Sequence, residues 1–238
     1  MKKLISIIFL GLITIGLLWA QPDIGIFRKQ IIIDRIEEPF INPLMATVYI
    51  EEKGVGTGVI LTEDGYILTA AHIVEDSSVV SIYLSLFPTH EYKAQLIYKE
   101  DLFDLAILKM ETDLILPTIK WGSSKEVKIA NEVFLVGHPY RFGWTVSRGI
   151  VSSLRFDDYG IAYIQTDASA HPGNSGGGLF NDKGEFIGLF SFIYVRLGYF
   201  GSTSLNVGWA SASDIIKVIS GGIIQVHRLM IENLRRVN

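Results

Sequence analysis

Residues 46–72 read ATVYIEEKGVGTGVILTEDGYILTAAH and decide the fold class. Two runs rich in β-branched side chains, Ala46–Glu52 and Val55–Thr62, are followed by the turn residues Glu63-Asp64-Gly65 and then by Tyr66–Thr69. β-branched and aromatic runs separated by Gly and Asp are typical of strands joined by tight turns. This stretch therefore predicts a β-hairpin.

The same pattern continues along the chain at intervals of roughly eight to twelve residues, which favours a sandwich or barrel. Further predicted strands lie at Val79–Leu84, Tyr92–Tyr98, Leu105–Met110, Glu132–Val136, Thr145–Leu154, Ile161–Thr166, Gly178–Phe180, Glu185–Ile193 and Val207–Ala210. A boundary between two β halves is expected near Lys120–Lys128. Helical periodicity begins only at Ser213, and Gly221-Gly222 is expected to break or kink that helix.

The composition argues against several classes of function. The 238 residues carry 21 basic and 25 acidic side chains, for a net charge of −4, and no basic run exceeds two residues. This balance argues against nucleic acid as a partner. The absence of cysteine excludes disulfides, a thiol nucleophile and Cys-ligated metal sites.

The N-terminus has the pattern of a targeting segment. Lys2 and Lys3 precede an uncharged apolar stretch over residues 4–20. A charged start followed by an apolar segment is typical of a signal peptide or a membrane anchor, and both place the remainder outside the cytoplasm. Residues 1–20 are therefore expected to be a signal peptide or membrane anchor, and residues 21–43 a proline-containing tether.

Gly173-Asn174-Ser175-Gly176-Gly177 is the stretch with the clearest chemistry. A serine hydroxyl is a weak nucleophile unless a base activates it and donors stabilise the oxyanion that it creates. Glycines on both sides allow the N–H groups of Gly173 and Ser175 to converge on one point. The alternative is a glycine-rich turn that carries an ordinary serine.

Two other residues supply the partners that such a serine needs. His72 follows the strand end Thr69-Ala70-Ala71, and Asp104 immediately precedes the apolar run Leu105–Met110. A carboxylate can hold an imidazole in the tautomer that accepts a proton from serine. Taken singly, each has an ordinary alternative, a structural histidine and a capping aspartate, but together they form a His, Asp, Ser order.

The sequence shows no pattern typical of a metal-binding or phosphate-binding site. The histidines at 72, 90, 138, 171 and 227 lack the spacing of a metal-binding helix. The glycines of residues 54–58 lead into a strand rather than a helix N-terminus, so a phosphate loop is not expected. No metal and no organic cofactor are predicted.

The ordered motifs resemble the trypsin-like serine proteases, and within them the protease domain of the HtrA/Deg family. The matching stretches are Gly56–Ile60, Gly65–His72, Asp104–Lys109, Val136–Pro139, Gly149–Ser152, Gln165–Ala168 and Gly173–Gly177. The resemblance implies an all-β fold of two packed six-stranded antiparallel barrels followed by a C-terminal helix. The implied protease domain covers residues 44–238, with barrels at about 44–120 and 128–212 and the helix at about 213–238.

By motif position, the resemblance implies that His72 is the general base, Asp104 its orienting partner and Ser175 the nucleophile. It places the oxyanion hole at Gly173, Asn174 and Ser175, and allows a homotrimer. Because 27 residues follow Ser211 in this sequence, the PDZ domain that commonly follows in this family is not expected. His138 stands where the family commonly has asparagine, and His171 is expected to shape the loop or contact substrate.

The resemblance also predicts which residues determine the cleavage specificity. Ser169 stands six residues before Ser175, at the base of the specificity pocket in trypsin-like enzymes, and it is no acid. Cleavage after Lys or Arg is therefore not expected, and Phe190 and Ser191 are expected to line a pocket for small or medium apolar residues. Asp167 is a rival acid, for which a link to the loop at Arg141–Gly143 is the favoured interpretation.

The sequence thus predicts a serine endopeptidase that acts on unfolded or exposed polypeptides outside the cytoplasm, with residues 4–20 as a candidate membrane tether. The alternative is a catalytically silent peptide-binding module on the same fold. An α/β-hydrolase is disfavoured, because its nucleophile precedes its acid and histidine in the chain.

Overall fold

The computed structural model describes residues 34–52, 54–156, 158, 160–198 and 201–237. Backbone alone is described from 192 to 206 within these ranges, and at 237. The expected signal or anchor segment at 1–20 and most of the expected tether lie outside the described residues.

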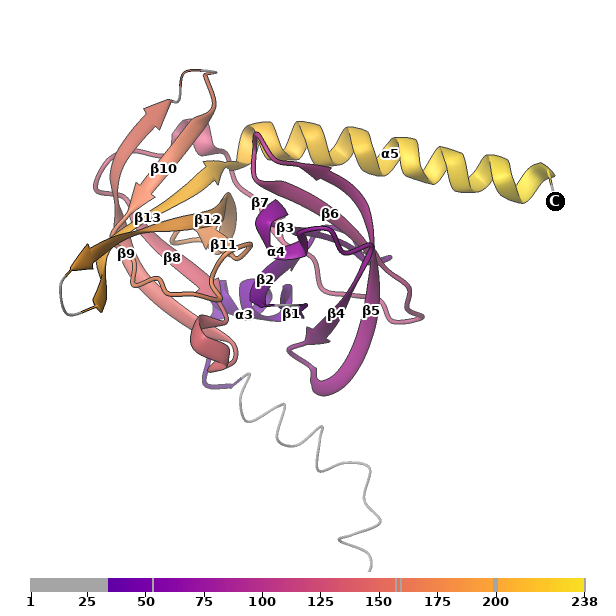
Figure 1. Ribbon diagram of the computed structural model, residues 1–238, viewed down its shortest axis with the longest axis horizontal. Helices are drawn as coiled ribbons and strands as arrows, with labels where there is room; N and C mark the ends of the chain where they lie inside the picture. Colours follow the sequence, from indigo (N-terminus) through magenta and orange to yellow (C-terminus); the bar gives the residue numbers. More distant parts are fainter. Residues whose placement is uncertain (1–33, 53, 157, 159, 199–200, 238) are drawn as a thin grey trace, which may run out of the picture. The chain divides into compact units, whose positions relative to one another are not determined.

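Six strands close the first barrel in the described part of the chain (Figure 1). They are β1 (Thr47–Glu51), β2 (Val55–Ile60), β3 (Tyr66–Thr69), β4 (Val79–Leu84), β5 (Phe87–Glu100) and β6 (Leu105–Met110). The strand order is β1-β2-β3-β6-β5-β4, and an antiparallel β1–β4 pairing closes the ring. The hairpin predicted from the opening stretch is confirmed as β2 and β3.

Alternation of buried and partly exposed side chains builds the core of this barrel. Val48 and Ile50 are fully buried, whereas Tyr49 and Glu51 between and after them are only partly buried. Since side chains alternate across a strand, one face of β1 points into the barrel. The buried set also includes Ile67, Ile82 and Leu108 from three other strands, which gives the barrel its own apolar core.

The second barrel is closed in the same way by antiparallel pairs among the described residues. Its strands are β8 (Glu132–Gly137), β9 (Thr145–Phe156), β10 (Ala162–Thr166), β11 (Gly178–Phe180), β12 (Glu185–Gly198) and β13 (Gly201–Ala212). The order is β11-β8-β9-β10-β13-β12, and β11 also pairs with β12. The short strand β7 (Lys120–Trp121) adds to β12 in parallel. The expected fold class, two six-stranded barrels, is confirmed.

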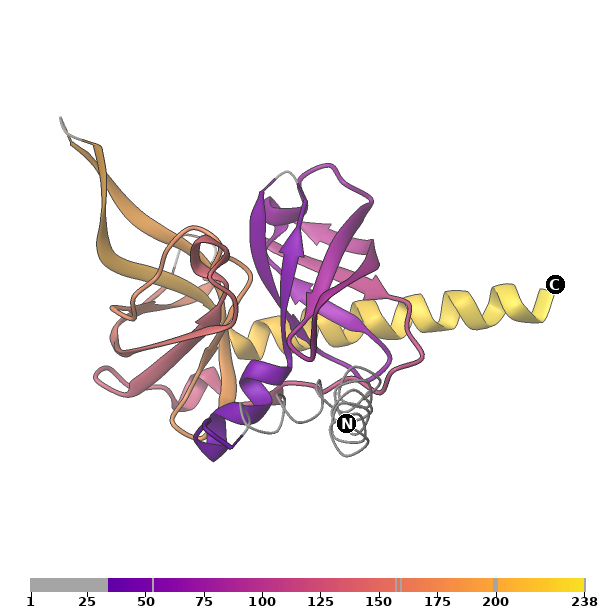
Figure 2. The same cartoon turned by 90° about the horizontal axis from the view of Figure 1, so that it is seen from below.

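Short helices precede or connect these strands in the described part of the chain. They are α3 (Glu38–Met45), α4 (Ala71–Val74), η1 (Ser124–Glu126) and η2 (Pro139–Arg141). The helix α3 begins where the sequence predicted only a lead-in, because Phe40 and Leu44 gain burial there. The Phe40 ring packs on Phe134 of β8, with 4.2 Å between centroids. Figure 2 shows β12 and β13 continuing as a long hairpin away from their barrel.

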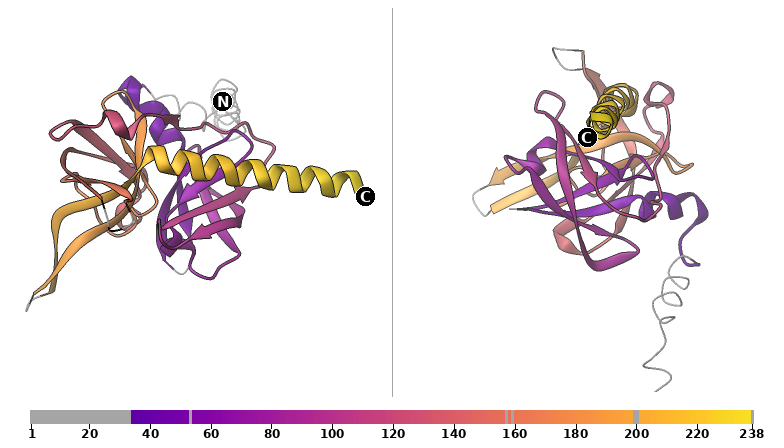
Figure 3. Two further views of the ribbon diagram at one scale, coloured as in Figure 1. Left: turned by 90° about the horizontal axis from the view of Figure 1, so that it is seen from above. Right: turned by 90° about the vertical axis from the view of Figure 1, so that its right-hand side faces the viewer.

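The C-terminal helix α5 (Ser213–Val237) runs without interruption through Gly221 and Gly222, so the expected break is wrong. Contacts beyond the glycines hold the helix against the first barrel (Figure 3). The Tyr66 hydroxyl and His227 Nδ1 are 2.9 Å apart, and Arg228 forms an ion pair with Asp64 at 2.7 Å. These contacts offset the weak helix propensity of glycine, about 1 kcal/mol per residue. Among the described residues, no helix combines the length and apolar character needed to cross a membrane.

Replacing Gly222 by Ala should stabilise the protein. Both helix glycines are exposed, and a Cβ at Gly222 meets nothing within 4 Å. Removing glycine from a helix interior gains about 1 kcal/mol, which raises the melting temperature by about 2–4 °C in a chain of this size. The matched control is Gly184→Ala, where φ is +70° and a Cβ would lie 1.9 Å from the Pro39 carbonyl oxygen. Calorimetry should show a rise for the first variant and a fall for the second; a fall for both would contradict this interpretation.

Candidate active site

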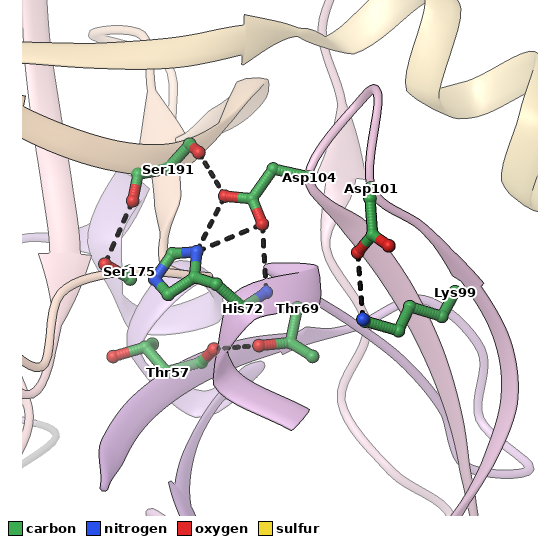
Figure 4. A network of polar contacts seen from close by, with 8 residues as sticks. All are labelled: Thr57, Thr69, His72, Lys99, Asp101, Asp104, Ser175 and Ser191. Atoms are coloured by element: carbon green, nitrogen blue, oxygen red, sulfur yellow. Dashed lines mark hydrogen bonds and ion pairs between the residues drawn. The ribbon is translucent and has the colours of Figure 1, made fainter. Parts of the chain in front are cut away.

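Strand pairing in the first barrel brings His72 next to Asp104. His72 lies in α4, just after β3, and Asp104 immediately precedes β6, the antiparallel neighbour of β3. His72 Nδ1 is 2.8 Å from Asp104 Oδ2 and 3.0 Å from Oδ1 (Figure 4). The backbone N–H of His72 also donates to Asp104 Oδ1, at 3.0 Å. Two strand ends thus fix the imidazole and the carboxylate as one unit.

The carboxylate of Asp104 is kept ionised by its hydrogen bonds. Burial alone would raise its pKa, but donation from the His72 side chain, the Ser191 hydroxyl and the His72 N–H outweighs burial. The pKa of Asp104 therefore lies below its ordinary value of 3.8. An ionised carboxylate beside Nδ1 favours the tautomer with the proton on Nδ1, which leaves Nε2 free to accept one.

Ser175 belongs to the second barrel, in the loop between β10 and β11, and a chain of hydrogen bonds connects it to Asp104 (Figure 4). Its Oγ donates to the carbonyl oxygen of Ser191 at 3.0 Å, and the Ser191 hydroxyl donates to Asp104 Oδ2. The structure thus brings His72, Asp104 and Ser175 together from two barrels. In this state the Ser175 hydroxyl is directed to the Ser191 carbonyl and not to the imidazole.

The turn around Ser175 leaves two N–H groups available. Gly173 and Gly176 have φ of +103° and +82°, a region that favours glycine. Among the described residues, neither Gly173 N–H nor Ser175 N–H donates to a protein acceptor, whereas Asn174 N–H donates to the His171 carbonyl at 3.0 Å. The buried Asn174 therefore shapes the turn and leaves the donor pair to its neighbours.

The loop between β8 and β9 also holds the nucleophile turn through a backbone hydrogen bond. Tyr140 N–H donates to the carbonyl oxygen of Pro172 at 2.9 Å. Tyr140 and Arg141 have positive φ, 49° and 67°, which is uncommon for residues with a side chain. Because the Pro172 carbonyl is held on this side, the Gly173 N–H of the same planar peptide points the opposite way.

Neither of the two nearby histidines competes with His72 for Ser175. His138 is 1% exposed, and burial lowers its pKa to about 3, so its ring is neutral. That ring packs edge-on against Trp144, with 4.4 Å between centroids. His171 Nε2 lies 3.3 Å from the Ser169 hydroxyl, and its ring packs on Tyr140. Both contacts agree with a loop-shaping role for His171.

The expected link from Asp167 to the loop at Arg141–Gly143 is wrong. Asp167 Oδ1 accepts a hydrogen bond from the backbone N–H of Ile150 at 2.7 Å. Arg141 instead forms an ion pair with Glu51 at 2.9 Å. Asp167 lies near the start of the nucleophile loop and bonds β9, because strand pairing of β9 with β10 brings Ile150 beside it.

The residues expected to line the specificity pocket occupy different surroundings. Phe190 is 1% exposed and belongs to the core of the second barrel, so its side chain offers no surface to a pocket. Ser191 directs its hydroxyl to Asp104. Ser169 is exposed, and its carbonyl accepts a hydrogen bond from Ser147. The link from Ser191 to Asp104 could not be predicted, since a serine within a strand carries no signal for a partner 87 positions away.

No group of three or more His, Asp or Glu side chains suited to a metal ion occurs in the part of the chain that the structure describes. The described site itself offers a hydroxyl, an imidazole, a carboxylate and two unpaired N–H groups.

Residues 56–189 match the family described as the trypsin-like peptidase domain, and the chain belongs to this family. Two curated relatives are named as probable periplasmic serine endoproteases, DegP-like. The chain is 41% identical over 170 residues to the one from Hahella chejuensis and 39% identical over 170 residues to the one from Marinomonas sp.. Each alignment covers 70% of this chain and 35% of the relative, so the chain spans about a third of their length.

A solved structure supports the same assignment. The HtrA-type protease AlgW with a tripeptide superposes with a TM-score of 0.69 at 28% identity, over 78% of this chain and 62% of that one. The resemblance to the HtrA/Deg protease domain is confirmed by these comparisons.

The lowered pKa of Asp104 gives its contribution to stability a defined pH window. Because the folded pKa lies below the unfolded value, the stabilisation is present above about pH 4 and is lost as the pH falls through the folded pKa. The difference in unfolding free energy between the wild type and Asp104→Asn should therefore shrink as the pH falls from about 5 through the folded pKa. Urea titrations at several pH values measure it. A difference that stays constant, or grows, over that range would refute the assigned hydrogen bonds.

Proposed function

We propose that the protein is a serine endopeptidase with Ser175 as nucleophile, His72 as general base and Asp104 as the residue that orients it. The observation that carries this proposal is the chain of hydrogen bonds from Ser175 through Ser191 and Asp104 to His72, beside two unpaired N–H groups on the nucleophile turn. A hydroxyl, a held imidazole and a donor pair are the parts that acyl transfer needs.

The reaction begins when Ser175 Oγ attacks the carbonyl carbon of the scissile bond while Nε2 of His72 takes its proton. Asp104 stabilises the resulting imidazolium. The carbonyl oxygen becomes negatively charged, and the N–H groups of Gly173 and Ser175 stabilise it. His72 then protonates the leaving amine, and the C–N bond breaks. Water activated by His72 attacks the acyl-enzyme and releases the carboxylic acid, which restores the Ser175 hydroxyl.

One rotation precedes this chemistry. The Ser175 hydroxyl donates to the Ser191 carbonyl in the structure, so its O–H must be redirected to donate to His72. Redirecting one hydroxyl is a local change that needs no movement of the barrels. Catalytic hydrogen bonds are commonly loose in unbound enzymes and tighten with substrate.

The proposed substrates are unfolded or exposed polypeptides outside the cytoplasm. Two observations support this: the charged and apolar start of the chain over residues 2–20, and relatives that are named as periplasmic endoproteases. Cleavage after small or medium apolar residues is proposed because Ser169 provides no negative charge for Lys or Arg. A membrane tether through residues 4–20 and a homotrimer belong to the same proposal.

Incubation of the purified chain with reduced casein tests the activity and the nucleophile together. The wild type should produce fragments that mass spectrometry maps to cuts after small or medium apolar residues, and Ser175→Ala should produce none. Cuts concentrated after Lys or Arg would overturn the proposed preference. Casein that is bound but left intact by the wild type would favour the peptide-binding module.

Two aspartate variants separate the proposed acid from its rival. Asp104→Asn should lower kcat by about 10⁴-fold, because the amide leaves His72 in the wrong tautomer. Asp167→Asn is the matched control: it changes only an acceptor for the Ile150 N–H, and it should retain most of the activity. Peptidase kinetics on a fluorogenic peptide measure both. The reverse order of the two effects would show that Asp104 is wrongly assigned.

A further inference from the structure

Thr57, on β2 of the first barrel, is fully buried and contacts the nucleophile turn of the second barrel at two points. Its hydroxyl donates to the carbonyl oxygen of Gly173 at 2.6 Å, and its backbone N–H donates to the carbonyl oxygen of Ser175 at 2.9 Å. The same hydroxyl accepts a hydrogen bond from the backbone N–H of His138 at 3.1 Å. One residue therefore bonds the nucleophile turn twice and the backbone at His138 once.

Thr69, at the end of the strand that precedes His72, holds Thr57 in turn. Its hydroxyl donates to the Thr57 carbonyl oxygen at 2.7 Å (Figure 4). Gly176 packs directly on this pair, since a Cβ there would lie 2.0 Å from the Thr57 carbonyl oxygen and 2.3 Å from the Thr69 hydroxyl. The turn that carries Ser175 is thus seated on two buried threonines, with no space for a larger residue at 176.

We propose that Thr57 is the positioning residue of the oxyanion hole, an inference that rests on the proposed peptidase function. Each peptide unit is planar, so a held carbonyl oxygen fixes the whole unit. Thr57 holds the units on both sides of the one that contains the Ser175 N–H: the hydroxyl holds Gly173–Asn174, and the N–H holds Ser175–Gly176. The unit between them carries the Ser175 N–H, and its own carbonyl, that of Asn174, accepts a hydrogen bond from the Gly177 N–H at 2.9 Å. With all three units restrained, the Ser175 N–H is held unpaired on the turn, available to an oxyanion.

The chemistry of the position explains why a hydroxyl is required there. A hydroxyl donates once and accepts as well, so it can satisfy a C=O and an N–H at the same time. Valine has nearly the same shape but can do neither. In Thr57→Val, the Gly173 carbonyl and the His138 N–H would be left buried without partners, and each such group costs about 1–3 kcal/mol unless the backbone turns to find another. If the Gly173 carbonyl turned, the whole Gly173–Asn174 peptide unit would turn with it. The next unit, which carries the Ser175 N–H, would then be displaced.

Thr47 offers a matched control within the same barrel. It is equally buried, and its hydroxyl donates to the Pro43 carbonyl at 2.7 Å, but it has no contact with the nucleophile turn. A purely structural role for Thr57 predicts that Thr57→Val and Thr47→Val both lower the melting temperature and leave kcat alone at temperatures where they are folded. A positioning role predicts that only Thr57→Val lowers kcat.

The first test is kinetic, on a fluorogenic peptide well below the melting temperatures. Removal of one oxyanion donor costs about 10²–10³ in kcat, so a displaced donor in Thr57→Val should cost at least about 10-fold, with KM within about threefold. Thr57→Ser keeps the hydroxyl and should stay within about threefold of the wild type, as should Thr47→Val. Equal kcat values for Thr57→Val and Thr47→Val, or a failure of Thr57→Ser to retain activity, would overturn the proposal.

The second test does not depend on turnover. Hydrogen exchange is measured in the Ser175→Ala background, and Thr57→Val should raise exchange in peptides that cover residues 172–178, whereas Thr47→Val should leave them unchanged. If the wild type proves inactive, this measurement still decides the role of Thr57, so failure of the peptidase proposal is distinguished from failure of this one. Unchanged exchange at 172–178 overturns it. Should Thr57→Val not fold, Thr69→Val removes instead the hydrogen bond that holds the Thr57 carbonyl against the turn, and it should raise exchange at 172–178 too.

Discussion

The site depends on hydrogen bonds that cross between two separately closed barrels. Each barrel has its own apolar core, so neither needs the other to satisfy its strands. The catalytic groups proposed here are nevertheless divided, with His72 and Asp104 on the first barrel and Ser175 on the second. The bonds from Thr57 to the Ser175 turn and from Ser191 to Asp104 set the register between them. Two rigid bodies joined by a few short bonds can hold reacting groups within narrow limits.

Steric constraint around Ser175 explains why the glycine pattern is so informative. A Cβ at Gly173 would lie 2.3 Å from the His138 carbonyl oxygen, and one at Gly176 would lie 2.0 Å from that of Thr57. Both positions also have positive φ. Packing and backbone conformation therefore each require glycine at these two positions, where the turn lies close to backbone atoms of both barrels. Because the glycines at 173 and 176 reflect these tertiary contacts, the five-residue stretch 173–177 could indicate a site.

The sequence predicted what depends on local pattern and missed what depends on distant partners. Strand positions follow from β-branched runs and turn residues, and the motif order led to His72, Asp104 and Ser175, which the structure places in one hydrogen-bonded chain. The burial of Phe190 and the hydroxyl of Ser191 depend on packing between strands far apart in the chain. The continuous helix α5 was missed for the same reason, because contacts of His227 and Arg228 with the first barrel outweigh Gly221 and Gly222.

In the proposed mechanism, the arrangement of two barrels activates Ser175 through His72. Reaction of the folded chain with a serine-reactive fluorophosphonate, followed by mapping of the adduct by mass spectrometry, measures this activation. A single adduct on Ser175 is expected, which forms rapidly in the wild type and is lost in His72→Ala. An unlabelled Ser175 in the folded wild type, or labelling that proceeds equally well without His72, would contradict it.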